Sequence, residues 1–476
     1  MNSPADYYAD PHVRERIAEY CGGVGAEPMS FSAEYLVGYG AYLKSSAHKE
    51  YFSSDVSNFH WILDHGLDIF RSVWDKESTV VVLDVEYFNI DYPGEIYHDP
   101  AACFLKLEPF HEVVQKKFQE WGIPHLTIMT GQGYHFAFKV LADSPADQTL
   151  ERIGCLPDSL VGKYTATSEH RHRRVSLKHG RAFDGLGRVM EYVGHELVRA
   201  TAGVGPVPVV FSDIAVGSVD GRYREAISVD LTAYGDPIFM RDIRCPFSTH
   251  QKHKVQVYKV GQRIAREIPV QISLPRRPDT PLHDLLTRRR NFAAAAEVAK
   301  TGDCILPGAD DPFDRLIRTY LESPLAAFHR EFDSADHDPW QAWPRTYDRL
   351  KLSNLPPCIA LPIRHPNPSL LQPTHVQNVV RYLFMNGWHP KHIGGLIRSK
   401  YERPYGWSED WTHFDACSRA NFWARLYAGA LAAGLDGLTD FNCVSMQERR
   451  LCPKPWCGHN LADIRPRPAA LRRSAK

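Results

Sequence analysis

One strand-forming segment constrains this chain more than any other part of its sequence. The apolar run Thr79–Val82 leads through Leu83 directly into Asp84 and Glu86. Consecutive β-branched residues are typical of a buried strand. Because strand side chains alternate between two faces, Asp84 and Glu86 are expected on one face, about 7 Å apart. Neighbouring carboxylates repel each other, so the pattern indicates a site for a hard divalent cation such as Mg²⁺. The alternative is a strand end whose acids simply face solvent.

Size and composition set only broad limits. A chain of 476 residues is long enough for two or three domains, and its 56 basic and 56 acidic residues cancel. Net charge therefore does not indicate a polyanionic partner. The segment Met1–Asp6 has no signal-peptide pattern, and no apolar stretch approaches the roughly 20 residues of a membrane span. We therefore expect a cytoplasmic protein without membrane association, whose ten cysteines do not form a disulfide framework.

The order of apolar runs and breakers predicts an α+β fold. Strands are expected at 79–85, 125–129, 134–140, 206–211 and 255–260, and helices at 109–120, 185–200 and near 282–300. The predicted units are an N-terminal helical region packing on the core (1–75), a catalytic domain (76–265), a linker with helices (266–350), a helical cysteine-rich domain (351–462) and a basic tail (463–476).

A glycine-rich hairpin is the second candidate element. Thr130, Gly131, Gly133 and His135 lie where one apolar run ends and another begins. Closely spaced glycines let a backbone approach a ligand, and the flanking hydroxyl and imidazole suit a phosphate group. A β-turn that needs glycine only for its geometry is the alternative.

Two further elements follow along the chain. Asp230 is an acid held between the apolar residues Val229 and Leu231. The segment Arg244–Lys252 combines Arg244, Ser248, His250 and Lys252, which would share one face if the segment were extended. That face would suit a triphosphate, because all four groups bind phosphate oxygens. The alternative is an exposed polar strand.

In this order the four elements resemble the archaeal–eukaryotic primase superfamily, which comprises the small catalytic primase subunit and its primase-polymerase relatives. The resemblance covers roughly residues 75–262 and departs where Glu86 and Thr130 replace the more usual Asp and Ser. It implies a primase-polymerase core with an RRM-like antiparallel sheet. It also implies that Asp84, Glu86 and Asp230 are catalytic and hold Mg²⁺ or Mn²⁺. The nucleotide-binding residues it implies are Thr130, Gly131, Gly133, His135, Arg244, Ser248, His250 and Lys252.

The function implied is that of a DNA-dependent nucleotidyltransferase that synthesises short primers on single-stranded DNA from NTPs or dNTPs. No helicase P-loop is found in the sequence, so a helicase or replication initiator would be a partner. The alternatives are a primer-extending repair or translesion polymerase and a non-catalytic single-stranded-DNA-binding replication initiator. A metal-dependent nuclease is disfavoured, because the segment after Asp230 suits a triphosphate.

Candidate DNA contacts come from clusters of basic residues. Arg171, Arg173 and Arg174 form the densest positive run, which could neutralise template phosphates. A solvated loop is the alternative, because the run lacks interleaved aromatic residues for base stacking. Arg381 is a further candidate, in the C-terminal region.

The C-terminal cysteines indicate a metal site. Cys443, Cys452 and Cys457 lie close together in sequence, and Cys358 follows two prolines further upstream. This region resembles the iron–sulfur domain of the large primase subunit, which implies that these four cysteines hold a [4Fe–4S] cluster. Zinc, with His459 replacing one thiol, is the alternative cofactor. Cys417 lies in an amphipathic segment and is predicted to be a core residue.

Overall fold

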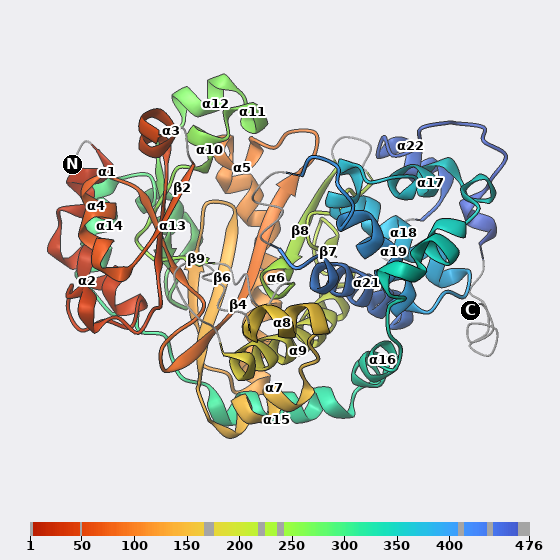
Figure 1. Cartoon of the computed structure of the whole chain (residues 1–476). Helices are drawn as coiled ribbons and strands as arrows, with labels where there is room; N and C mark the ends of the chain where they lie inside the picture. The colour runs from red at the N-terminus through yellow and green to blue at the C-terminus, as the bar shows by residue number, and fades with distance from the viewer. Residues whose placement is uncertain are drawn as a thin grey trace.

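The computed structural model describes residues 3–47, 50–165, 176–217, 224–235, 242–407, 414–435 and 441–464. It confirms the α+β class: two main sheets are followed by a C-terminal group of helices (Figure 1). None of the helices in these ranges combines the length and apolar character that crossing a lipid bilayer requires.

A six-stranded sheet forms the centre of the molecule. Its strands, in spatial order, are β12 (Leu274–Pro275), β5 (Leu126–Met129), β6 (Gly133–Leu141), β4 (Ser78–Asn89), β8 (Glu225–Asp230) and β7 (Val209–Phe211). Neighbouring strands are antiparallel except β7 and β8, which are parallel. The valine run makes the first half of β4 fully buried, and alternation begins at Asp84. The predicted strands at 79–85, 125–129 and 134–140 are therefore confirmed, with β4 longer than expected.

A second, four-stranded antiparallel sheet lies in the N-terminal part. Its order is β2 (Tyr51–Ser54), β1 (Leu36–Tyr39), β3 (Asp68–Ser72) and β9 (Asp242–Arg244). The helices here are α1 (Pro4–Tyr8), α2 (Pro11–Tyr20), α3 (Ala41–Ala47) and α4 (Phe59–Asp64). The N-terminal region predicted to be helical (1–75) therefore contains the strands β1, β2 and β3 as well as helices. The strands β1, β2 and β3 pair with one another locally, and only β3 pairs with the distant β9.

The chain after β9 turns rather than staying extended. A turn at Pro246 and Phe247, where Phe247 has φ 60°, leads into β10 (Thr249–His250), which pairs with β11 (Gln271–Ile272). The helices α10 (Lys252–Val255), α11 (Val257–Val260) and α12 (Gln262–Glu267) follow. The strand expected at 255–260 is therefore helical, because periodicity alone does not distinguish short apolar runs. The shared extended face expected for 244–252 is likewise not formed.

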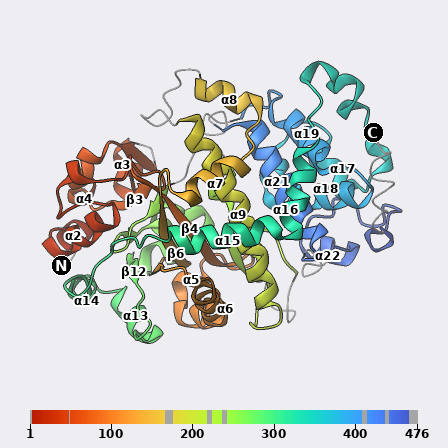
Figure 2. The same ribbon diagram turned by 90° about the horizontal axis from the view of Figure 1, so that it is seen from below.

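Helices cover the six-stranded sheet. They are α5 (Glu95–His98), α6 (Pro100–Trp121), α7 (Pro145–Ile153) and α9 (Leu177–Thr201), while α8 (Asp158–Thr165) packs on α9. The long helix α6 begins and ends at clear capping residues: the Asp99 side chain accepts from the Ala102 N–H at its start, and Gly122, with φ 68°, ends it. The following segment contains α13 (Leu282–Arg288), α14 (Phe292–Ala299), α15 (Asp310–Glu322) and α16 (Pro324–Asp333). Figure 2 shows α15 running across the molecule from the sheets to the C-terminal helices.

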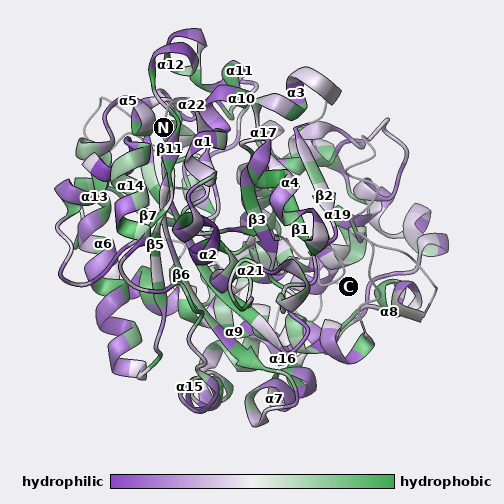
Figure 3. Cartoon of the chain, turned by 90° about the vertical axis from the view of Figure 1, so that its left-hand side faces the viewer, coloured by the Kyte–Doolittle hydropathy of each residue, from purple (hydrophilic) through white to green (hydrophobic). Residues whose placement is uncertain are grey.

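The C-terminal region is helical in the described ranges. Its helices are α17 (Pro357–Ile363), α18 (Pro373–Met385), α19 (Pro390–Tyr401), α21 (Ala416–Ala432) and α22 (Cys443–Glu448), with α18 and α19 packed on α21. One hydrophobic core extends from the N-terminal residues to these helices. Figure 3 shows hydrophobic residues along the interior strands and hydrophilic ones on peripheral helices such as α12.

A buried charge network ties α9 to the C-terminal helices. The Glu191 carboxylate on α9 accepts from Arg425 on α21 (Nε, 2.9 Å) and lies 3.0 Å from His329 Nε2 on α16. The other ring nitrogen of His329 lies 2.8 Å from the Tyr320 hydroxyl. Burial alone would raise the pKa of Glu191, but Arg425 and His329 lower it to about 2. Glu191 therefore stays ionised inside the protein.

Candidate functional site

The strand β4 carries the acidic residues of the site between its two partners. Asp84 is the direct cross-strand neighbour of Asp230 on β8 and of His135 on β6. Directly opposed residues of neighbouring strands point to the same face, so these three side chains form one row. Glu86 lies in the next row of that face, opposite Gly133 and Ser228. The predicted pairing of Asp84 and Glu86 on one strand face is present in the structure.

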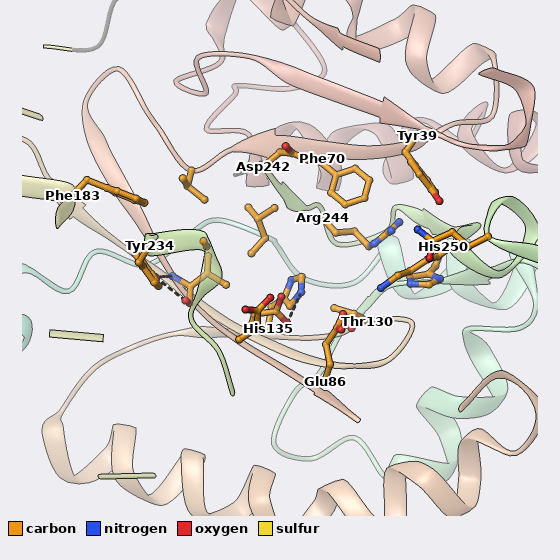
Figure 4. Close-up of a pocket in the computed structure, with 18 residues that line it drawn as sticks. Tyr39, Phe70, Glu86, Thr130, His135, Phe183, Tyr234, Asp242, Arg244 and His250 are labelled. Atoms are coloured by element: carbon orange, nitrogen blue, oxygen red, sulfur yellow. Dashed lines mark hydrogen bonds and ion pairs between the residues drawn. The ribbon is translucent and has the colours of Figure 1, made fainter. Parts of the chain in front are cut away.

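A cavity of about 270 Å³ opens over this row, which is large enough for a small molecule rather than a single water. Of the eleven residues predicted to be catalytic or nucleotide-binding, eight line it: Asp84, Glu86, Thr130, His135, Asp230, Arg244, His250 and Lys252. Figure 4 shows that they come from opposite sides, with Glu86, Thr130 and His135 facing Tyr39, Phe70 and Arg244. The six-stranded sheet thus supplies Asp84, Glu86 and Asp230, and the four-stranded sheet supplies the opposing wall, including Asp242.

The acidic side holds unbalanced negative charge. Burial first, and then the charges of Asp84, Asp213 and Asp230, raise the pKa of Glu86 to about 7, although Lys252 acts in the opposite direction. The Asp84 Oδ1 atom is buried and lies 3.3 Å from His135 Nε2, but accepts no hydrogen bond within the described residues. Asp230 Oδ1 accepts from the Thr232 N–H at 2.8 Å. Repulsion among these acids is relieved when a cation approaches.

The opposing side carries cations held in place by protein groups. Arg244 donates to Asp68 at 2.8 Å and to the Thr249 carbonyl, and its guanidinium lies 4.3 Å from the Phe70 ring centroid. Lys252 Nζ donates to the Gln132 side-chain oxygen at 2.5 Å. Burial opposes the charge of Lys252, but nearby carboxylates, Glu86 first, raise its pKa. Lys252 therefore stays protonated beside the acids.

His250 is neutral in this environment. Burial, followed by the charges of Arg244 and Lys252, lowers its pKa well below the usual value. A neutral imidazole donates one hydrogen bond rather than two. The Nδ1 atom of His250 has no hydrogen-bond partner among the described residues. It contributes a polar contact to the cavity without adding charge.

The remaining three predicted nucleotide-binding residues do not line the cavity. A Cβ on Gly131 would lie 2.1 Å from His250 Nε2, and one on Gly133 would lie 1.8 Å from the Val85 carbonyl oxygen. The two glycines therefore permit close packing of the hairpin against His250 and β4. Ser248 is fully buried, and its hydroxyl accepts from the Ile69 N–H and donates to the Thr249 carbonyl. The position of Ser248 is that of a structural residue joining β10 to β3.

Several site residues were not predicted from the sequence. Tyr39, Phe70 and Asp242 line the cavity from the four-stranded sheet, whose strands were not expected. Asp213 interacts electrostatically with Asp84, Glu86, Asp230 and Lys252. It was missed although it follows the apolar run 206–211 much as Asp84 follows its own run.

Of the predicted DNA contacts, only Arg381 lies within the described residues, and it does not line this cavity. Arg171, Arg173 and Arg174 lie outside the described residues. Arg381 lies on α18, is fully buried, and its guanidinium is 5.3 Å from the Phe441 ring centroid. In this arrangement it is an interior residue of the C-terminal helices rather than a surface cation.

Three of the four cysteines predicted to be ligands act electrostatically on the fourth, Cys358. Burial and then the thiols of Cys452, Cys443 and Cys457 raise the pKa of Cys358 to about 12. Cys417 has different neighbours: it is buried on α21, with Sγ 3.5 Å from His337 Nδ1. Across the described ranges, no three His, Cys, Asp or Glu side chains are arranged closely enough to hold a metal ion without movement.

The comparisons with known proteins returned no match. Neither a protein family, nor a curated protein, nor a solved structure was found to be similar to this chain.

Proposed function

We propose that this chain is a DNA-dependent nucleotidyltransferase, a primase or primase-polymerase that synthesises short primers on single-stranded DNA. One observation carries the proposal: three acids on adjacent strands face an arginine, a lysine and a neutral histidine across a single cavity. Nucleotidyl transfer needs this pairing, because acids hold the cations and basic groups hold the triphosphate. The primase-polymerase identity of the core and its RRM-like sheet belong to this proposal.

The acid group fits a hard divalent cation. Asp84, Glu86 and Asp230 offer carboxylate oxygens on one face, and the buried Asp84 Oδ1 lacks a hydrogen bond within the described ranges. Small side-chain movements are needed for these oxygens to converge. When bound, Mg²⁺ or Mn²⁺ would lower the pKa of the primer hydroxyl and neutralise charge on the leaving pyrophosphate.

The chain's own groups orient the nucleotide. Arg244 and protonated Lys252 attract the triphosphate, and neutral His250 donates one hydrogen bond to it. Tyr39 and Phe70 present aromatic rings on the same wall, against which a base could pack. Thr130 accepts from the Gly133 N–H at 3.2 Å, which holds the hairpin in shape beside the acids.

A primer-free synthesis assay tests the proposal. The purified protein is incubated with single-stranded DNA, NTPs and dNTPs, and Mg²⁺ or Mn²⁺, without primer. Products a few nucleotides long are the expected result. Synthesis only from an annealed primer would indicate a repair or translesion polymerase. DNA binding with no incorporation under any condition would indicate a non-catalytic replication initiator, and degradation of the DNA would indicate a nuclease.

We also propose that Cys358, Cys443, Cys452 and Cys457 hold a [4Fe–4S] cluster. The electrostatic influence of Cys452, Cys443 and Cys457 on Cys358 supports it, since metal ligands must share one site. We expect the purified protein to be brown, with broad visible absorbance. Cys358→Ser should lower the iron content at least about two-fold, whereas Cys155→Ser, an exposed cysteine elsewhere, should not. A colourless protein with stoichiometric zinc would contradict the cluster.

A further inference from the structure

The loop after β7 brings a fourth acid to the site. The Ser212 N–H donates to the Val229 carbonyl at 3.0 Å, which continues the parallel pairing with β8 one residue beyond β7. Ser212 is buried and has φ 57°, a backbone conformation that is uncommon for residues other than glycine. The parallel register places Asp213 near the end of β8, whose last residue is Asp230, and the two carboxylates interact electrostatically. Local backbone strain of this kind often marks a functional site.

The charge of Asp213 acts on the residues of the cavity. Its strongest charged neighbours are Asp230, which repels it, and Lys252, which attracts it. Asp213 is exposed and is not among the residues that line the cavity, so it lies beside the cavity rather than within it. Lys252 thereby lies among several carboxylates, with Glu86 and Asp213 contributing most to its attraction.

The same loop is held from the other side by the C-terminal helices. The Ala215 N–H donates to the Thr374 hydroxyl oxygen at 2.7 Å, at the start of α18. The Ala215 carbonyl accepts from Arg449 Nη1 at 3.1 Å. Residues from distant parts of the sequence thus hold both the N–H and the carbonyl of Ala215, which lies two positions after Asp213. Without these contacts the loop would have many more conformations available.

Arg449 links this loop to the cysteine segment. It is buried, follows α22 directly, and also donates to the Ser445 carbonyl at 3.2 Å. The helix α22 begins at Cys443, and Cys452 lies three residues beyond Arg449. Arg224, which precedes β8, reaches the same helix end through the Glu448 carbonyl at 3.3 Å. The C-terminal region is therefore attached both to the loop after β7 and to the residue before β8.

We propose that Asp213 is a positioning residue of the acidic site, held there by the C-terminal helices through Thr374 and Arg449. Its carboxylate orients Lys252 and adds a fourth negative charge toward a divalent cation bound by Asp84, Glu86 and Asp230. The inference rests on the proposed function, because it assumes cation binding at these acids. The C-terminal region then contributes to the site without supplying a residue that touches the substrate.

Mn²⁺ binding, measured by electron paramagnetic resonance of the free ion, tests the role of Asp213 independently of activity. Asp213→Asn should weaken Mn²⁺ binding about ten-fold, as expected for a residue supporting the ligands. Asp213→Glu should restore most of the affinity, and Asp279→Asn, an exposed acid elsewhere, should leave it unchanged. Equal denaturation midpoints for these variants would show that folding is intact. Unchanged Mn²⁺ binding by Asp213→Asn would overturn the inference.

Two further variants separate the parts of the argument. Thr374→Val removes the hydroxyl that fixes Ala215 and should weaken Mn²⁺ binding in the same direction as Asp213→Asn, by about two- to five-fold. The matched change Thr319→Val, at an exposed helical threonine, should have no effect. If Asp213→Asn weakens binding and Thr374→Val does not, the holding role of the C-terminal helices is wrong. If the Asp84→Ala variant binds Mn²⁺ as tightly as the wild type, the proposed function itself is wrong.

Discussion

Replacing Asp84 with alanine is expected to lower nucleotide incorporation by about 10²–10³-fold or more while the protein stays folded. Asp84 is the centre of the acid row, with Asp230 and His135 directly opposite it on the two neighbouring strands. Its removal takes away an oxygen donor that Glu86 and Asp230 cannot replace from their own positions. Incorporation is measured by primer extension on a fixed template, at saturating metal and nucleotide.

Stability should respond differently from activity. The Asp84 side chain is 30% exposed and lies among like charges, so its loss also relieves repulsion. The urea denaturation midpoint of Asp84→Ala should therefore equal or exceed that of the wild type. Asp279→Ala, which changes an exposed acid far from β4 in sequence, is the control for both measurements. Wild-type incorporation by Asp84→Ala would remove the acid row from the catalytic site.

Replacing Glu191 with alanine is expected to destabilise the protein by about 3–5 kcal/mol, because it leaves Arg425 buried without its main counter-charge. Glu191 and Arg425 are 1% and 4% exposed, so water cannot replace the lost interaction. His329 also loses the carboxylate that accepts its ring N–H. The free energy of unfolding is measured by urea denaturation followed by circular dichroism.

A neighbouring glutamate provides the matched control. Glu196, on the same helix, pairs with Arg199, and both are partly exposed, so Glu196→Ala should cost at most about 1 kcal/mol. Equal losses in the two variants would contradict the importance of the buried network. Lowering the pH should reduce the difference in unfolding free energy between the Glu191→Ala and Glu196→Ala variants. The folded-state pKa of Glu191 lies below the unfolded value, so the contribution of Glu191 to stability is full above pH 4.5. It is lost as the pH falls toward 2.

Local pattern was enough to predict parts of the site that depend on one strand. The alternation of side chains along a strand predicts that Asp84 and Glu86 share one face, and β4 places them there. The valine run likewise predicts β4, since a strand of β-branched residues buries well in a sheet centre. Gly131 and Gly133 were correctly assigned to a hairpin, although their role is close packing.

Site features that depend on contacts between segments far apart in the chain could not be predicted from the local sequence pattern. The pairing of β9 with β3, more than 150 residues away in the chain, sets Arg244 directly opposite Phe70 in the cavity wall, and the local pattern does not reveal it. Asp213 depends on the parallel register of β7 with β8 and on contacts from Thr374. After the turn at Phe247, the Ser248 hydroxyl accepts a hydrogen bond from the Ile69 N–H of β3, and Ser248 does not line the cavity. In each case a long-range contact decided the outcome.

The attachment of Arg244 has a consequence for how tightly an anion binds. Asp68, the Thr249 carbonyl and the Phe70 ring already hold this side chain in one orientation. Immobilising a long, flexible side chain on binding normally costs about 0.5–1.5 kcal/mol of conformational entropy. Here that cost is met during folding, so an arriving phosphate meets a guanidinium that has little rotational freedom left to lose.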